Sequence, residues 1–136
     1  MTNPFKVACL QPNCGADVDA NVAHVSELGR KARDAGANLI TMPETVNIMA
    51  PDRATLKAAS QPEEGNVALV GFQDLARETG AWILVGSLLV GVPGSEKMAN
   101  RSFLLDSDGV IRVRYDKIHM FDVNLGGAEN YRESDH

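Results

Sequence analysis

The sequence predicts an α/β protein built around a parallel sheet, and three observations indicate this class. Short apolar segments of strand length alternate with longer segments in which apolar residues recur at helical spacing. The first three segments, 5–11, 18–36 and 37–44, follow each other with tight connections. Strand, helix, strand in this order is typical of a parallel crossover unit. Each long helical segment also ends at a glycine, Gly36 or Gly80, directly before an apolar run.

The first helix is the clearest single element. Asp17 and Asp19 precede or open it and offer N-caps, because a short carboxylate can accept from free backbone N–H groups at a helix start. The two strands that flank it each end near a proline, Pro12 or Pro43. One face of this helix collects apolar residues at helical spacing, namely Val22, Val25, Leu28, Ala32 and Ala35.

The second half of the pattern contains a helix over 65–80, a buried strand at 81–90 and a hairpin. The hairpin is expected around Asp106-Ser107-Asp108-Gly109, because glycine supplies the positive φ that such turns need. A short helix over 53–59 is also expected, whereas 126–136 looks irregular. We expect Val67, Val70, Leu75 and Ala76 to share the buried side of the helix and Trp82 to lie in the core.

These elements lead to a specific arrangement. Strands 5–11, 37–43 and 81–90 should lie in one sheet, with the two long helices packed together on one face.

Composition excludes several classes of function. The chain has 136 residues, enough for one domain, and a net charge of -5 with no basic block, so nucleic acid is not expected as a partner. The longest nearly apolar run, 81–92, is shorter than the roughly 20 residues of a membrane helix, so no membrane is expected either. The N-terminus lacks a secretion signal, and Cys9 and Cys14 are too few for a disulfide framework. We therefore expect a cytoplasmic protein in which Cys9 is a reduced core residue.

Three charged residues follow strands of the predicted sheet. Glu44 comes directly after Pro43, Lys117 follows the second strand of the hairpin, and Glu133 lies in the next loop. Sites in open α/β sheets gather at the carboxyl ends of strands. A carboxylate, an ammonium and a second carboxylate can serve as general base, oxyanion stabiliser and orienting group. Glu63 and Glu64, by contrast, read as a solvated acidic pair ahead of a helix.

The strings around these residues are more specific than the residues themselves. ANLITMPE, RYDKIHMFD, the upstream KVACLQ and the downstream GG…YRES occur in this order. Together they resemble the N-terminal half of the nitrilase, or carbon–nitrogen hydrolase, superfamily, and within it the Nit-type amidase branch. The resemblance implies that residues 1–136 are the N-terminal part of a single carbon–nitrogen hydrolase domain whose C-terminal part is absent. The implied fold is half of a four-layer α-β-β-α sandwich.

The resemblance also implies a Glu–Lys–Cys triad. Matched motif to motif, the glutamate falls on Glu44, the lysine on Lys117 and an additional active-site glutamate on Glu133. The family's nucleophilic cysteine follows a later strand, and neither Cys9 nor Cys14 occupies that position. The expected partners are therefore a small amide or nitrile substrate, the missing C-terminal half with its cysteine, and further copies in a homo-oligomer. No cofactor and no metal are implied.

Two hypotheses of function follow. The first is a thiol hydrolase of non-peptide carbon–nitrogen bonds, most simply a small-amide amidase of the ω-amidase kind, of which this chain alone is inactive. The second is a non-catalytic α/β domain that binds a small molecule or another subunit. A strand followed by a cysteine in the remainder of the reading frame would favour the first.

Overall fold

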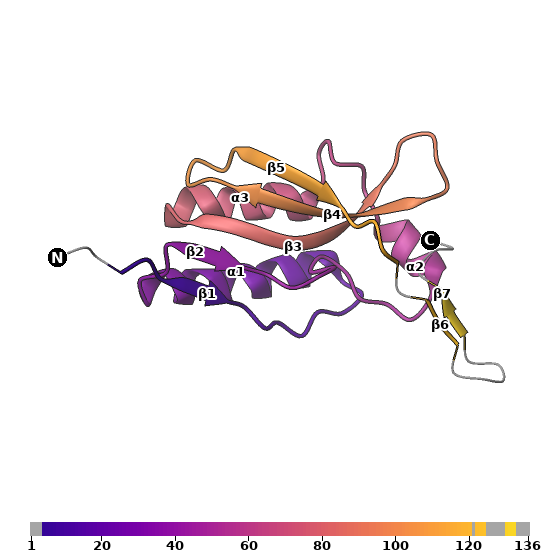
Figure 1. Ribbon diagram of the computed structural model, residues 1–136, viewed down its shortest axis with the longest axis horizontal. Coiled ribbons are helices and arrows are strands. Elements are labelled where there is room, and N and C mark those ends of the chain that lie inside the picture. The colour runs from indigo at the N-terminus through magenta and orange to yellow at the C-terminus, as the bar shows by residue number, and fades with distance from the viewer. Residues whose placement is uncertain (1–3, 121, 125–129, 133–136) are drawn as a thin grey trace.

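A five-stranded sheet with two long helices on one face forms the body of the molecule (Figure 1). The computed structural model describes residues 4–120, 122–124 and 130–132. Strand order in the main sheet is β1-β2-β3-β4-β5. In sequence the elements of the main sheet's parallel half are β1 (Val7–Cys9), α1 (Val18–Asp34), β2 (Leu39–Thr41), α2 (Arg53–Ala59), α3 (Val67–Thr79) and β3 (Trp82–Gly91).

The parallel half confirms the predicted crossover. β1, β2 and β3 are parallel neighbours, and α1 and α3 pack against each other on the same side of the sheet. Asp17 is the N-cap of α1 and accepts from the Ala20 backbone N–H at 3.0 Å. β1 and β2 are shorter than expected, because their pairing covers only three residues before each chain turns away.

The antiparallel half is the predicted hairpin. β4 (Met98–Leu105) and β5 (Ile111–Asp116) are joined by a turn in which Gly109 has φ +73° and Asp106 Oδ1 accepts from the Asp108 and Val110 N–H groups. β4 begins at Met98, in the turn-rich segment 91–100 between the predicted strand at 81–90 and the hairpin turn. The expectation that 126–136 is irregular was wrong in part, because β7 (Asn130–Arg132) pairs with β6 (Asp122–Asn124) as a second, two-stranded sheet.

The core lies between the helices and one face of the sheet. Val67 and Val70 were expected there, yet they are 41% and 43% exposed. The buried stripe of α3 is turned from the expected one, because Phe72, the largest buried side chain of the helix, sets its orientation. The buried residues of this stripe are Ala68, Leu69, Phe72, Leu75 and Ala76, and they meet Ile40, Ile83, Val85, Phe103 and Leu105 of the sheet.

Among the described residues, no helix lies on the opposite face of the sheet (Figure 1). Cross-strand register places Cys9, Thr41, Leu84, Leu104 and Val113 in one row on this face, since paired residues point to the same side. We call it the open face. Its exposed apolar side chains are Val7 (48%), Trp82 (42%), Leu84 (37%), Val113 (54%) and Tyr115 (53%).

The open face corrects two expectations. Cys9 and Trp82 were assigned to the core, but both are exposed. Alternation identifies the two faces of a strand, and it does not say which of them this chain covers. Across the described residues, no helix is both long and apolar enough to pass through a lipid bilayer.

Candidate active site

The carboxyl ends of β2 and β5 meet at one edge of the sheet. β2 is parallel to β3, β4 is antiparallel to β3, and β5 is antiparallel to β4, so β2 and β5 run in the same direction. Glu44 follows β2 and Lys117 directly follows β5. Lys117 Nζ donates to Glu44 Oε1 at 2.9 Å. The strand-end positions and the family resemblance predict these two side chains within direct or one-water reach, and the direct contact confirms this.

The loop that carries Glu44 is held by the distal half of β3. The register between β3 and β4 shifts between Val85 and Leu88, which marks a bulge. At this bulge Ser87 Oγ accepts from the Thr45 N–H at 2.8 Å, and the Ser87 N–H donates to the Pro43 carbonyl at 3.3 Å. Both residues that flank Glu44 are thus tied to one serine, and Thr45 takes the unusual φ of +47° that the turn requires.

Gly86 permits this close approach. A Cβ at this position would lie 2.1 Å from the Met42 carbonyl oxygen and 2.5 Å from that of Pro43. Backbone atoms cannot yield as a flexible side chain can. The glycine is therefore a steric requirement of the Glu44 loop, because it lets two backbones come together.

Asn47 completes the support of this loop. Its amide donates to the Leu89 carbonyl at 3.1 Å and its oxygen accepts from the Leu89 N–H at 2.9 Å, so it imitates a strand partner for β3. The residue is 1% exposed. Satisfied buried amides of this kind fix a loop in one conformation.

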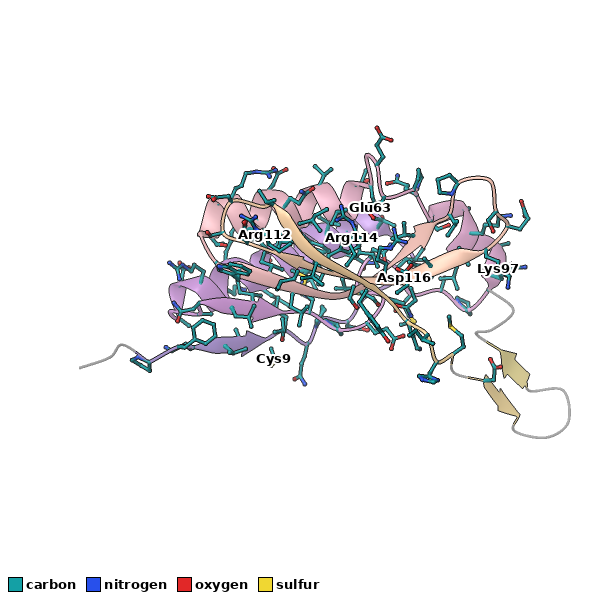
Figure 2. The ribbon with its side chains drawn as sticks, turned by 45° about the horizontal axis from the view of Figure 1, so that its top comes forward. Cys9, Glu63, Lys97, Arg112, Arg114 and Asp116 are labelled. Atoms are coloured by element: carbon teal, nitrogen blue, oxygen red, sulfur yellow. The ribbon has the colours of Figure 1, made fainter. Side chains whose placement is uncertain are left out.

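An ionic ladder holds the end of β5 just before Lys117. Arg101 makes a two-pronged contact with Asp116, at 2.6 and 2.9 Å, and also donates to Glu63 at 2.8 Å. Arg114 donates to the second oxygen of Glu63 at 2.7 Å. Figure 2 shows Glu63, Arg114 and Asp116 in this part of the molecule. The sequence indicated that Glu63 is solvated, and this was wrong, because two arginines bind its carboxylate. Hydrogen bonding from Arg101 also lowers the pKa of Asp116.

Asn100 of β4 joins the pair, although nothing in the sequence analysis indicated it. Its Nδ2 donates to Glu44 Oε1 at 2.7 Å, while its backbone carbonyl accepts from the Lys117 N–H at 2.9 Å. Asn100 is 7% exposed. It lies near the amino end of β4, which meets the carboxyl ends of β2 and β5 because β4 runs in the opposite direction.

The remaining candidates are placed differently. Glu133 lies outside the described residues. Cys14 donates its thiol to the Val46 carbonyl at 3.2 Å, and burial raises its pKa, so it is protonated at neutral pH. The described part of the chain contains no group of three His, Cys, Asp or Glu side chains that could hold a metal ion.

The pair itself lies at an open edge. The Glu44 side chain is 56% exposed and that of Lys117 is 27% exposed. A hollow of about 730 Å³ lies elsewhere, beside α3 and β4, and neither residue lines it. The arrangement offers a carboxylate and an ammonium that can act on one substrate. The Glu44 side of the pair is exposed to solvent.

Comparison with known proteins identifies the family. The Carbon-nitrogen hydrolase model matches residues 6–135. The chain belongs to the carbon–nitrogen hydrolase family. Deaminated glutathione amidase of Yersinia enterocolitica is 34% identical over 131 residues, which are 95% of this chain and 45% of that protein. Omega-amidase NIT2 of Mus musculus is 28% identical over 133 residues, 96% of this chain and 46% of that protein.

Solved structures of the family share the fold. The crystal structure of the C. elegans NitFhit protein superimposes with a TM-score of 0.81 at 22% identity, over 94% of this chain and 31% of that one. An amidase from Nesterenkonia sp. gives 0.74 at 22% identity, over 86% and 44%. This carbon–nitrogen hydrolase chain thus has an α/β fold of the nitrilase superfamily, and it spans less than half the length of these relatives.

Proposed function

We propose that this chain is the N-terminal part of an enzyme that hydrolyses non-peptide carbon–nitrogen bonds, and that the substrate is a small amide. The observation that carries the proposal is the 2.9 Å contact between Lys117 Nζ and Glu44 Oε1 at the edge where β2 and β5 end, in a chain of the carbon–nitrogen hydrolase family. The names of the amidase relatives support an amide as the substrate.

Glu44 is the proposed general base. A thiol nucleophile from the rest of the protein would give its proton to the Glu44 carboxylate as its sulfur attacks the amide carbon. The C–N bond of the resulting tetrahedral intermediate then breaks, and the same proton passes to the departing ammonia or amine. A water molecule then attacks the thioester carbon while Glu44 accepts a proton from that water. The C–S bond breaks to release the carboxylic acid, and Glu44 returns the proton to the departing sulfur.

Lys117 is the proposed stabiliser of the intermediate. Attack at a carbonyl carbon places negative charge on its oxygen, and a fixed ammonium nearby lowers the energy of that charge more in a dry site than in water. The ionic ladder of Arg101, Asp116 and Glu63 fixes the strand end that carries this lysine. Glu133 is proposed to hold Lys117 and to position the substrate or the water.

The rest of the domain would supply what this chain lacks. We assign it the nucleophilic cysteine and the second sheet of the sandwich, packed on the open face about 10 Å away. A second sheet would also cover the edge at which Glu44 is 56% exposed and so exclude water from the reaction. We further propose that the complete protein forms homo-oligomers.

Ammonia release from a panel of small amides by the full-length protein tests the proposal. Lys117→Ala should lower kcat by about 100-fold to 1000-fold or more, because an oxyanion stabiliser is removed. Glu44→Gln should abolish turnover, because an amide cannot accept the thiol proton.

Matched controls come from ion pairs far from the site. Lys31→Ala breaks the Lys31–Glu27 pair on α1, and Glu78→Gln weakens the pair of Glu78 with Arg30. Both should keep wild-type turnover. Substantial activity in Lys117→Ala would contradict the oxyanion role, and a folded wild type that binds amides without hydrolysing them would favour the non-catalytic hypothesis.

A further inference from the structure

We propose that Asn100 is a positioning residue for Glu44, whose amide holds one carboxylate oxygen so that the other accepts the proton of the nucleophile. The inference deepens the proposed function and rests on it. It starts from a 2.7 Å hydrogen bond between Asn100 Nδ2 and Glu44 Oε1, made by side chains that lie 56 positions apart in the chain.

Two donors converge on the same oxygen of Glu44. Asn100 Nδ2 reaches Oε1 at 2.7 Å and Lys117 Nζ reaches it at 2.9 Å. Within the described residues, both hydrogen bonds to this carboxylate end on Oε1 and none on Oε2. The carboxylate is thus oriented by one oxygen, and Oε2 is the oxygen that can accept a proton without losing an existing contact.

Asn100 also touches the other member of the pair. Its backbone carbonyl accepts from the Lys117 backbone N–H at 2.9 Å, directly after the end of β5. Asn100 therefore contacts both members of the pair. Its backbone holds the Lys117 backbone in place, and its side chain orients the Glu44 carboxylate. A displacement of β4 by one residue would disturb both groups together.

The chemistry of an amide suits this task. Lys117 alone would leave Glu44 free to rotate about the ion pair, because an ammonium is a point charge with three equivalent donors. A planar amide that is 7% exposed presents its N–H in a fixed direction and cannot titrate. Orientation of a reacting group supplies much of an enzyme's rate, so a residue that touches no substrate can still affect kcat.

Asn100→Ala in the full-length protein is the first test, with kcat, KM and the pH profile of kcat/KM measured on a hydrolysed amide. We expect kcat to fall about 10-fold to 100-fold, the size of one lost hydrogen bond to a charged group, with KM little changed. The loss should therefore appear in kcat and not in KM, a split that a general loss of stability would not produce.

Asn100→Asp is the second test, because it keeps the shape of the side chain and replaces the amide with a carboxyl group that can gain or lose a proton. The introduced carboxyl group can donate to Glu44 when protonated and repels it when ionised. Activity relative to the wild type should therefore recover at low pH and fall as the pH rises, which is a dependence that a purely structural role would not produce.

Asn66→Ala is the matched control. Asn66 is a buried asparagine, 2% exposed, that caps α3 and makes no contact with Glu44. It should lower thermal stability and leave the pH profile unchanged. The positioning role is overturned if Asn100→Ala behaves like Asn66→Ala, or if it keeps kcat/KM within twofold of the wild type. A wild type that hydrolyses no amide overturns the proposed function instead, and this inference with it.

Discussion

The two faces of the main sheet differ in what covers them and in the side chains that they carry. The covered face packs fully buried residues such as Ile83 and Phe103 under α1 and α3, and charged side chains border it. The open face presents Trp82, Leu84 and Val113 to solvent. β5 shows the contrast within six residues, because Arg112 and Arg114 make ion pairs on the covered side while Val113 and Tyr115 point to the open one.

The difference indicates what each face meets. Charged side chains surround the covered face, as is usual where a buried core meets solvent. The open face has apolar side chains in cross-strand register over β1 to β5, and monomers rarely expose contiguous apolar patches of more than a few hundred Å². We therefore expect residues 1–136 alone not to form a stable monomer, and the second sheet of a sandwich is the cover that the family fold supplies.

The largest expected effect separates two adjacent residues of β3. Ile83→Asp in the chain of residues 1–136 should abolish folding, since an unpaired buried carboxylate costs more than about 4 kcal/mol. Leu84→Asp should keep the secondary structure of the unsubstituted fragment and shift its associated species toward smaller ones, because it adds a charge to the open face and leaves the core unchanged. Circular dichroism and sedimentation velocity measure both effects. Equal loss of structure in the two variants would remove the distinction between the faces.

The next effect concerns the bulge of β3 that lies against the Glu44 loop. Gly86→Ala in the full-length protein should cost about 1–3 kcal/mol or more in the free energy of unfolding and remove most activity, because its Cβ would overlap the Met42 carbonyl. Denaturant unfolding and an amide hydrolysis assay report the two losses. Gly15→Ala is the control, since a Cβ there meets nothing within 4 Å.

A smaller effect tests the charged border of the covered face. Hydrogen bonds from the Val110 N–H and from Arg112 lower the pKa of Asp106 below its ordinary value of about 3.9. A lowered folded pKa stabilises the protein above the ordinary value, and this contribution is lost as the pH falls through the lowered value. Unfolding of the full-length protein should therefore become easier as the pH falls below about 4. Asp106→Asn should flatten this dependence, whereas Asp108→Asn at the exposed turn should preserve it.

The smallest effect is spectroscopic and uses the single tryptophan of the chain. Trp82 lies on the open face and is 42% exposed. Its emission in a soluble Leu84→Asp form of residues 1–136 should be red-shifted and quenched by acrylamide. In a full-length variant whose only tryptophan is Trp82, the emission should shift to the blue and resist quenching. Equal quenching in both would show that the open face stays wet.

Local patterns predicted the elements, and topology predicted the pair. Glycine and aspartate located the hairpin turn, and the rule that parallel strand ends share an edge brought Glu44 and Lys117 together across 73 positions of sequence. Asn100 was missed because β4 is antiparallel to β2 and β5, so its amino end lies beside their carboxyl ends. Asn100 therefore lies near the start of a strand, next to a segment rich in turn residues. Cys9 and Trp82 were misplaced because which face of a sheet is covered is a tertiary property that alternation alone does not encode.

The 73-residue span of the Glu44–Lys117 pair also has a kinetic consequence. The β4–β5 hairpin closes over neighbouring residues, whereas the pair requires β2 and β5 to be in the same sheet first, and contacts between distant residues form late. The proposed catalytic pair should therefore be among the last features to assemble during refolding. Pulsed hydrogen exchange can follow this order, with the hairpin amides protected before the Thr45 N–H. An enzyme built in this way acquires its reactive carboxylate only after its scaffold has been completed.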